Sequence, residues 1–348
     1  MTEQRPIQPT PVGALRFNTD SAKLEYFDGN EYVNITTDSP EANTGGTRGV
    51  YWNSINPSPS AELKQIDTIQ INTTGNSTDF GDSIVSQGIR GACGSRIRGI
   101  CGGGYNNHPL SDTIDFITYS STGDATDFGN LLGQYFSNGA ASSATRGLWM
   151  GGTTNATSVS GSQDVIQYVT IASTGNAVDF GNMISAISTS STFNSPTRAI
   201  AAGGYQVPAN ATTNTIQYVT TSTLGNSADF GDLSSISGFN NSMQGCNAVR
   251  AVMALGNVSP THVNTVEFFT MATLGNSTDF GDVSTASEFL TAASSPTRCV
   301  WHINASGGGD GDKLEYVQIM TTGNGVDFGD CTERMRTAGC SNGHGGLG

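Results

Sequence analysis

Two residue types recur at fixed positions along the chain and could together do chemistry. An aspartate precedes a Phe-Gly pair six times, at Asp79, Asp127, Asp179, Asp229, Asp279 and Asp327, and an arginine recurs at Arg48, Arg98, Arg146, Arg198, Arg250 and Arg298. Each copy offers one fixed carboxylate, whereas calcium takes about six to eight oxygen ligands. We therefore expect the aspartates to cap turns or to pair with the arginines of the same or the next repeat. A ring of arginines that binds an anion around a central channel is the alternative.

The cysteines and histidines do not have the spacing of a metal site. The residues are Cys93, Cys101, Cys246, Cys299, Cys331 and Cys340, without a CxxC pair, and His108, His262, His302 and His344, which are dispersed. A cysteine in a strand-like segment serves as a small apolar residue, and zinc needs clustered ligands. We expect free thiols, no metal site and no cofactor, with His302 beside Trp301 in the core.

The aspartate motif belongs to a repeat that organises the chain. The segment TGNSTDFGD at 74–82 returns five more times, and its phenylalanine falls at Phe80, Phe128, Phe180, Phe230, Phe280 and Phe328. The period of 48 to 52 residues indicates one supersecondary unit that is used six times. We expect the phenylalanines to pack between successive units.

Each repeat carries the pattern of four short strands. A run rich in Ile, Val, Thr and aromatic residues precedes the motif, as in IDTIQINT from Ile66, and this composition is typical of strands. Gly75 and Asn76 predict a two-residue hairpin turn into a short return strand. Upstream, an apolar segment follows each recurring arginine, as in TRAIAAGG from Thr197, and adds a second pair of strands. Four strands per period are expected of one blade of a β-propeller.

The repeat resembles that of Kelch-like β-propellers. The shared features are an apolar strand that ends in Gly-Gly, as at 102–103, 151–152 and 203–204, then a variable loop and an aromatic-bearing strand. The resemblance implies an all-β chain in which residues 47–348 form a six-bladed propeller of ~50-residue repeats. The C-terminal segment 335–348 matches the segment before each arginine. It is therefore expected to supply the innermost strand of the first blade and to close the ring without exposed edges.

The N-terminal residues predict a separate module. Residues 1–12 are polar and contain proline, which predicts an extended arm. Residues 13–35 alternate apolar and polar residues, which predicts a three-stranded β-meander. Residues 36–46 have the composition of a linker. Three strands alone are marginal in water, so we expect the meander to trimerise or to dock on another protein. The candidate docking residues are Leu15, Phe17, Leu24, Tyr26, Phe27 and Tyr32.

A second resemblance covers this module. The phrase GALRFNTDSAKLEYFDGNEYV resembles the N-terminal module of tail-fibre and other virion structural proteins of marine tailed phages, notably those that infect cyanobacteria. The tandem TGNSTDFGD repeats also resemble repeats in such proteins. The resemblance implies a virion protein that is assembled in the host cytoplasm and attached through residues 1–43 to other virion proteins. It also implies several copies, as a trimer or as a multicopy protein on the particle.

The function expected from the second resemblance and from the variable loops is attachment to a host-surface glycan or protein. The loops after the Gly-Gly position differ between repeats, and variable loops on a repeated scaffold are where binding usually resides. The candidate receptor-binding residues are Tyr105, Asn106, Asn107, His108, Tyr205, Gln206 and His262. The alternative is a purely structural decoration or joint protein of the tail or capsid that has no contact with the host.

Composition disfavours other classes of function. The formal net charge of −14 argues against nucleic acid as a partner. No apolar run approaches the ~20 residues of a membrane span, so membrane insertion is not expected. β-Propellers include sialidases and copper oxidases, but the DFG motif is not the Asp-box of a sialidase, and the four histidines are too few for a copper oxidase of Kelch type. We therefore expect no catalytic activity.

Overall fold

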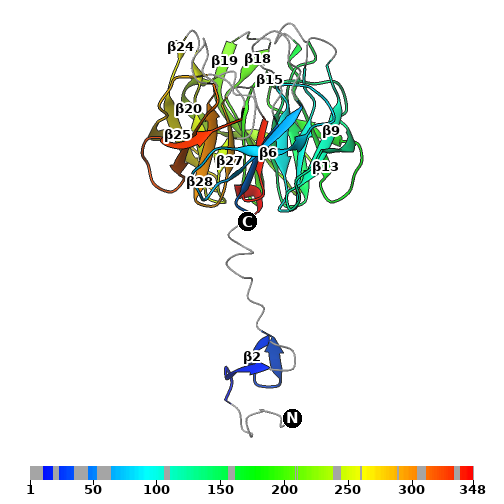
Figure 1. The fold of residues 1–348 in the computed structure, drawn as a ribbon, viewed down its shortest axis with the longest axis vertical. Helices are drawn as coiled ribbons and strands as arrows, with labels where there is room; N and C mark the ends of the chain where they lie inside the picture. Colours follow the sequence, from blue (N-terminus) through cyan, green and yellow to red (C-terminus); the bar gives the residue numbers. More distant parts are fainter. Residues whose placement is uncertain are drawn as a thin grey trace. The chain divides into compact units, whose positions relative to one another are not determined.

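The chain is all-β and divides into two compact units. The computed structural model describes residues 11–18, 23–34, 46–52, 64–105, 110–155, 161–207, 209, 211–237, 244–258, 261–287, 290–303, 311–332 and 338–347. The N-terminal unit comprises Met1–Thr44 and the C-terminal unit Gly45–Gly348 (Figure 1). Apart from one short 3-10 helix, η2 (Gly345–Leu347), every named element of the described residues is a β-strand. This all-β content agrees with the strand-forming composition of the repeats.

The N-terminal unit contains one three-stranded antiparallel sheet with the order β1-β2-β3. Its strands are β1 (Leu15–Asn18), β2 (Lys23–Phe27) and β3 (Tyr32–Asn34). Asp28 builds the turn between the second and third strands, because its Oδ1 atom accepts the N–H groups of Asn30 at 2.7 Å and Glu31 at 2.8 Å. These bonds are the local contacts that make aspartate a turn residue.

The C-terminal unit contains six antiparallel sheets, which we number 1 to 6 along the chain. Each has four strands in the same order from its inner to its outer edge, although the chain ends meet in sheet 1. The strands are β31 (Ala338–Ser341), β4 (Arg48–Trp52), β5 (Gln65–Gln70) and β6 (Thr78–Asp82) in sheet 1; β7 (Gly91–Gly94), β8 (Arg98–Gly102), β9 (Thr113–Thr118) and β10 (Thr126–Asn130) in sheet 2; β11 (Gly139–Ser142), β12 (Arg146–Met150), β13 (Val165–Thr170) and β14 (Val178–Asn182) in sheet 3; β16 (Ser191–Asn194), β17 (Arg198–Ala202), β19 (Ala211–Thr220) and β20 (Ala228–Ser237) in sheet 4; β21 (Gly245–Cys246), β22 (Arg250–Ala254), β25 (Thr265–Thr270) and β26 (Thr278–Asp282) in sheet 5; and β27 (Thr291–Ser294), β28 (Arg298–Ile303), β29 (Lys313–Gln318) and β30 (Val326–Asp330) in sheet 6.

Two sheets carry additional short strands. In sheet 4, β15 (Ala186–Ser188) and β18 (Tyr205–Val207) extend the pairing beyond β19. Next to sheet 5, β23 (Asn257–Val258) and β24 (Thr261–His262) form a small hairpin of their own. These additions fall in segments that differ between the repeats, so the variation lies outside the four-stranded pattern.

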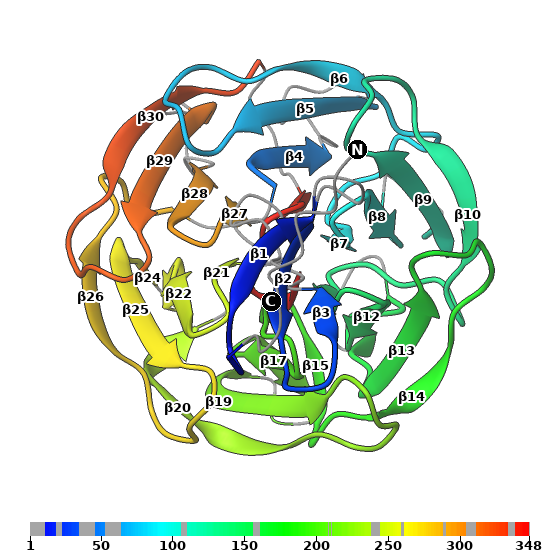
Figure 2. The same ribbon diagram turned by 90° about the horizontal axis from the view of Figure 1, so that it is seen from below.

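The six sheets follow one another around a common centre (Figure 2). The inner strand of each sheet contacts the inner strand of the next sheet, and β31 contacts both β27 of sheet 6 and β7 of sheet 2. Within sheet 1, β31 pairs with β4 from Ala338 opposite Trp52 to Ser341 opposite Gly49. The C-terminal strand therefore completes the sheet that residues 48–82 begin, which is the pairing that the sequence predicts for the two ends of the chain.

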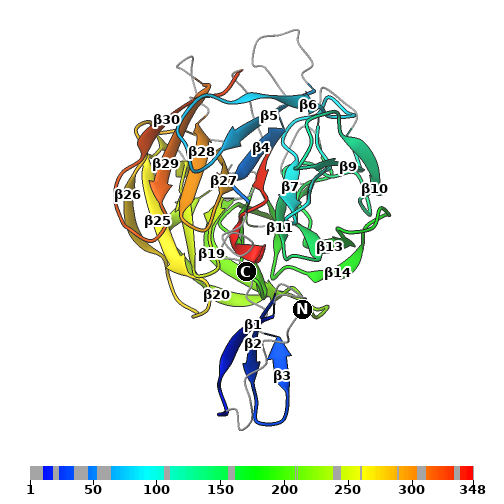
Figure 3. The same ribbon diagram turned by 60° about the horizontal axis from the view of Figure 1, so that its bottom comes forward.

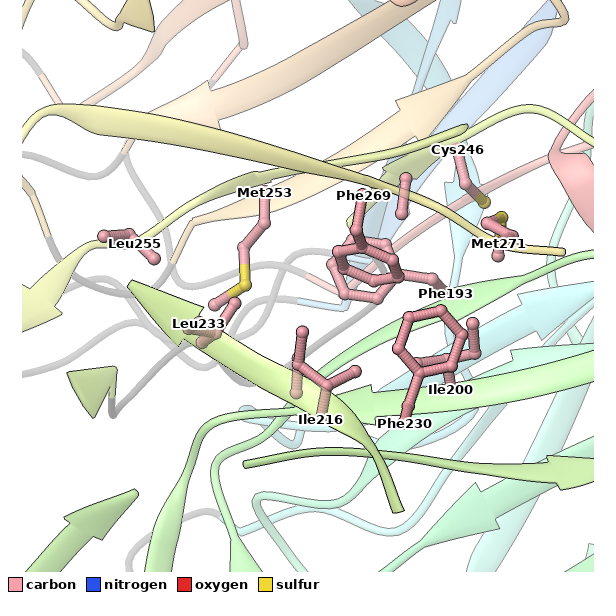
Figure 4. Packing of buried hydrophobic residues seen from close by; sticks show 12 residues of the cluster. Phe193, Ile200, Ile216, Phe230, Leu233, Cys246, Met253, Leu255, Phe269 and Met271 are labelled. Carbon is pink, nitrogen blue, oxygen red and sulfur yellow. The ribbon is translucent and has the colours of Figure 1, made fainter. Parts of the chain in front are cut away.

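The hydrophobic core consists of separate clusters between neighbouring sheets. The cluster between sheets 4 and 5 contains Phe193 and Phe230 from one sheet and Met253 and Phe269 from the next (Figure 4). The rings of Phe193 and Phe269 are 5.1 Å apart and nearly perpendicular, an arrangement that aromatic pairs favour. All six phenylalanines of the DFG motif are buried in such clusters. The prediction that they pack between successive units is confirmed.

The prediction of a two-residue hairpin turn is wrong. In sheet 1 the last pair between β5 and β6 is Thr68 with Thr78, so the connection between the two strands is much longer than Gly75 and Asn76. Gly75 has a φ of 153°, but its N–H does not bond within the hairpin and instead donates to Phe328 of sheet 6 at 2.7 Å. A contact with the neighbouring sheet therefore replaces the local turn.

Candidate functional site

Antiparallel pairing sorts the connections of the C-terminal unit onto two faces. In each sheet the turn from the first to the second strand and the turn from the third to the outer strand lie on one face, which we call the turn face. The loop from the second to the third strand and the link to the next sheet lie on the opposite face, which we call the loop face. In Figure 1, β18 and β24 lie at the loop face and the C-terminus lies at the turn face.

At the outer strands, the DFG motif joins each sheet to the turn from the third to the outer strand of the next one. The N–H of Gly123 in sheet 2 donates to the carbonyl of Phe80 in sheet 1 at 2.7 Å, and Asp124 Oδ1 accepts the N–H of Asp82 at 3.0 Å. We call this pair of contacts the clasp. The five other junctions form it through Gly175 and Asn176, Gly225 and Asn226, Gly275 and Asn276, Gly323 and Asn324, and Gly75 and Asn76. The last of these joins sheet 6 to sheet 1, so the clasp also connects the two ends of the repeated region.

The clasp requires glycine in the DFG motif. Gly81 has a φ of +148°, and a Cβ atom built on it would lie 2.4 Å from the backbone carbon of Gly123. The five equivalent glycines meet the turn of the next sheet in the same way. A side chain would therefore strain the backbone and force the two sheets apart at once.

The predicted pairing of the arginines with the DFG aspartates is wrong. The arginine opens the second strand of each sheet, the aspartate lies on the exposed outer strand, and the third strand lies between them. Arg198 instead donates from Nη1 to the carbonyls of Met271 at 2.8 Å and Ala272 at 3.1 Å, just after the third strand of the next sheet. Its guanidinium lies 4.6 Å from the ring centre of Tyr218. The arginines thus satisfy strand-end carbonyls and stack on aromatic rings.

The alternative of an anion-binding ring of arginines is not supported either. In every sheet the inner strand lies between the arginine-bearing strand and the centre of the ring. All six guanidinium groups donate to carbonyls of the next sheet, through Arg48, Arg98, Arg146, Arg198, Arg250 and Arg298. The recurring arginines therefore hold the sheets together.

A second set of contacts between sheets was not foreseen from the sequence. Each third strand carries one buried acid or amide at the same register, namely Asp67, Asp115, Gln167, Gln217, Glu267 and Glu315. In all six sheets, its side-chain oxygen accepts a backbone N–H from the preceding sheet. The donor is the second residue after the last residue of the DFGD or DFGN motif. For example, Gln217 Oε1 accepts the N–H of Ile184 at 3.0 Å. The signal in the sequence was a polar residue directly after an apolar one, at the same position in the third strand of every sheet.

The partners of this buried residue vary with its charge. The carboxylates of Asp67, Glu267 and Glu315 also accept the hydroxyl of Thr332, Ser234 and Ser284, respectively. Asp115 accepts the N–H of Ile84 and the hydroxyl of Ser83, and it forms a buried ion pair with Arg90 at 2.8 Å. Where the buried residue is the neutral Gln167 or Gln217, the facing residue is Leu132 or Ile184. Each buried carboxylate thus accepts a hydroxyl group, and the neutral Gln217 accepts one as well, from Ser227 at 2.7 Å.

The C-terminal residues pack against the inner strands at the turn face (Figure 3). His344 is buried, and its Nε2 atom lies 2.8 Å from the carbonyl oxygen of Gly94 in sheet 2, to which it donates. Its Nδ1 atom accepts the N–H of Gly346 at 3.1 Å and the amide of Asn194 in sheet 4 at 3.0 Å. Burial and nearby Arg96 lower the pKa of His344 to about 4. A proton on Nδ1 would face two donors, so this site holds the neutral ring.

The candidate receptor-binding residues lie on the loop face but do not form one cluster. Tyr205 and Gln206 lie on β18 and pair with Ser188 and Ile187 of β15. His262 lies in the hairpin beside the next sheet, opposite Asn257. Tyr105 follows β8 of sheet 2, and sheet 3 lies between sheet 2 and sheet 4, which carries Tyr205. The ring of Tyr105 lies 5.4 Å from that of Phe136. Asn106, Asn107 and His108 lie outside the described residues.

The candidate docking residues of the N-terminal unit fall on two faces of its sheet. The register places Leu15 opposite Tyr26 and Phe17 opposite Leu24, and these four side chains are exposed. Phe27 is buried and pairs with Tyr32, with ring centres 5.3 Å apart. Because side chains alternate between the faces of a strand, Phe27 and Tyr32 lie on the opposite face from the other four. The six residues therefore do not form one docking surface.

The cysteines and His302 lie in the interior, as their sequence context predicts. All six cysteines are free and buried. Burial raises the pKa of the Cys93, Cys101 and Cys340 thiols well above its ordinary value, which makes them poor nucleophiles. Burial also lowers the pKa of His302 to about 4.

Neither a metal-binding group nor a membrane-spanning helix is present among the described residues. Among these residues, no group of three or more His, Cys, Asp or Glu side chains has the arrangement to hold a metal ion. The same residues include no helix with the length and apolar character to cross a membrane.

Comparisons with known proteins do not assign the chain to a family. No protein-family model matches the chain, and no curated protein matches it significantly.

Proposed function

We propose that the C-terminal unit is a six-bladed Kelch-like β-propeller and that the chain is a phage virion protein of the fibre or adhesin type. The propeller binds a host-surface glycan or protein through its loop face, and residues 1–43 attach the chain to other virion proteins. Assembly takes place in the host cytoplasm, and several copies on the particle add weak contacts into a strong attachment. The protein has no catalytic activity.

The proposal is carried by one observation, the contrast between the two faces of the C-terminal unit. The turn from the third to the outer strand makes the same clasp in all six sheets, whereas at the loop face sheets 4 and 5 carry short strands that differ from each other, β15 with β18 and β23 with β24. The chain also enters this unit at the turn face, because the N–H of Gly46 donates to the carbonyl of Asn342 at 2.9 Å. The varied face of this unit is therefore opposite the face at which Gly46 enters it, which suits an exposed binding surface.

The six sheets support the propeller in particular. Each is an antiparallel four-stranded pattern, and the inner strands contact one another in sequence with the last sheet beside the first. Such a radial arrangement leaves only short, protected edges.

The test is binding of the fluorescently labelled full-length chain to intact cyanobacterial host cells and to non-host cells. We expect selective binding to the host, competition with infection, and loss of binding in loop-face variants such as Tyr205→Ala. Binding that is equal on host and non-host cells would contradict the adhesin function. Labelling of purified particles with an antibody against the chain tests the virion location separately.

A purely structural role is the second candidate. Its supporting observation is that the described candidate residues Tyr105, Tyr205 and His262 are half-buried and paired with neighbouring segments. A decoration or joint protein would be incorporated into particles through residues 1–43 and would bind neither host nor non-host cells.

A further inference from the structure

The two faces of the N-terminal sheet differ in an unusual way. One face consists of uncharged side chains, which the register brings together from all three strands. Their exposed fractions are 63% for Leu15, 57% for Phe17, 40% for Leu24, 38% for Tyr26 and 37% for Val33. We call these five residues the apolar face. It occupies the central strand and both of its neighbours.

The opposite face of the same sheet is the covered one. Arg16 forms an ion pair with Glu25 at 2.7 Å, and the side chains of the two residues are only 17% and 8% exposed. The guanidinium of Arg16 also lies 3.6 Å from the ring centre of Tyr32, which packs against Phe27. A sheet in water normally hides its apolar side and exposes its charged side. Here the charged pair is covered and the apolar residues are open, so another surface is needed to cover them.

We propose that the apolar face packs against the same face of a second copy of the chain. The whole chain has a formal net charge of −14, so two copies repel each other wherever their carboxylates approach. The apolar face contains no ionisable acid or base near neutral pH, and the ion pair of Arg16 with Glu25 is on the other side. Two copies can therefore meet here without burying an unpaired charge. A charged partner would find nothing on this face to recognise.

The size of the face fits a weak and reversible pair. Covering the exposed parts of these side chains in two copies removes about 1,000 Å² of surface from water, which is typical of weak interfaces. The result is a two-layer sandwich of sheets with an apolar interior, the arrangement in which small sheets become stable. An identical patch on both copies gives a twofold contact that closes on itself.

This inference does not rest on the proposed function, and it changes one part of the expected site. Four of the six candidate docking residues belong to the pair between copies: Leu15, Phe17, Leu24 and Tyr26. Attachment to a particle would then use other parts of residues 1–43. Failure of the pair would leave the loop-face proposal untouched, since that proposal is tested by binding to cells.

The first test is the mass of the full-length protein by light scattering between about 1 and 100 µM, the range in which weak pairs form. We expect the mass to rise from that of one chain, 36.1 kDa, toward twice this value. Phe17→Glu places a charge on the apolar face and should keep the protein at one chain throughout. Leu274→Glu is the matched control, because Leu274 is equally exposed at 57% but lies in the C-terminal unit. It should associate as the unchanged protein does.

Three results would overturn the proposal. The unchanged protein could remain at one chain over the whole range, or Phe17→Glu could associate as well as the control. A final mass of three chains would support the trimer expected from the sequence and contradict the pair.

A second test holds even if Phe17→Glu disturbs the small sheet. All six native cysteines are buried, so an introduced cysteine is the reactive one. Leu24→Cys, at the middle of the apolar face, should give a two-chain product with a short bis-maleimide. Asn30→Cys, in the exposed turn of the same sheet, is the control and should give at least tenfold less product. Equal yields from the two variants would show random collision and would contradict the assigned face.

Discussion

Two regions of each junction between sheets in the C-terminal unit hold the neighbours by different means. At the outer strand, backbone groups and one short side chain make the clasp, as in the bond from Gly123 to Phe80, and all six junctions are alike. At the third strand, the junctions depend on a buried side chain that is Asp, Gln or Glu. Backbone contacts leave little room for change, whereas a side-chain contact can be exchanged when its partner changes too. The constant clasp thus joins all six pairs of sheets, and the buried side chain of the third strand is the contact that varies.

The largest effect should come from opening the ring at sheet 1. Deletion of residues 338–348 removes β31 and η2 and leaves β4 without its inner partner. We expect loss of the single cooperative unfolding transition, because the sheets adjoining the gap lose a buried neighbour. Deletion of residues 1–44 is the control and should shift the midpoint of urea unfolding very little. A cooperative transition in the protein without β31 would show that the ring does not depend on closure.

The next effect should distinguish the clasp from ordinary glycine strain. Gly231 and Gly275 have nearly the same φ, +149° and +150°, but a Cβ on Gly231 would lie 2.4 Å from the carbonyl oxygen of Gly275, while one on Gly275 meets nothing within 4 Å. We expect Gly231→Ala to lower the free energy of unfolding by about 4 kcal/mol and Gly275→Ala by about 1 kcal/mol. Urea unfolding of both variants measures the difference. Equal losses would mean that backbone conformation alone demands glycine.

Acid should weaken the turn face through His344. Its folded pKa of about 4 lies below the ordinary value of 6.5, so the unfolded chain binds the proton more tightly. The stabilisation of the fold by the neutral His344 ring is fully present above pH 6.5. It is lost as the pH falls toward 4, which lowers the free energy of unfolding by up to about 3 kcal/mol. His344→Gln should be less stable at pH 7 yet lose less stability between pH 6.5 and 4 than the unchanged protein. Parallel stability curves for the two proteins would contradict a neutral ring at this position.

The variable junctions should tolerate an exchange only when both partners change. Gln217→Glu places a carboxylate beside the hydroxyl of Ser227 and opposite Ile184, which donates its N–H but supplies no second hydroxyl. We expect a loss of about 2 kcal/mol at pH 7. Adding Ile184→Ser imitates the pair of Glu267 with Ser234 and should restore about 1 kcal/mol. A double-mutant cycle by urea unfolding gives the coupling, and additive losses would refute the matching of partners.

The smallest effect on stability is expected at the loop face itself. Tyr205→Ala removes a half-buried side chain from the short strand β18, outside the four-stranded pattern of sheet 4. Its free energy of unfolding should fall by less than about 1 kcal/mol, while binding to host cells should be lost. A large loss of stability would place Tyr205 among the structural residues and remove it from the candidate site.

The sequence by itself determined the elements that recur. Its six-fold period, the strand composition and the buried phenylalanines of the DFG motif each predicted a feature that the structure has, because periodic apolar residues report directly on which side chains must leave water. The match between 335–348 and the segment before each arginine likewise predicted the pairing of β31 with β4.

Only the tertiary structure decided which groups of different sheets meet. Gly75 and Asn76 have the composition of a local turn, yet they contact sheet 6, and the arginines bond to carbonyls that carry no mark in the sequence. The candidate loop residues were likewise spread over separate sheets, and the docking residues over two faces. The spacing of residues along the chain indicates which residues are neighbours within one strand or hairpin, whereas contacts between sheets depend on how the sheets pack. Backbone donors and acceptors are also the same in every residue other than proline, so the sequence does not indicate which of them pair between sheets.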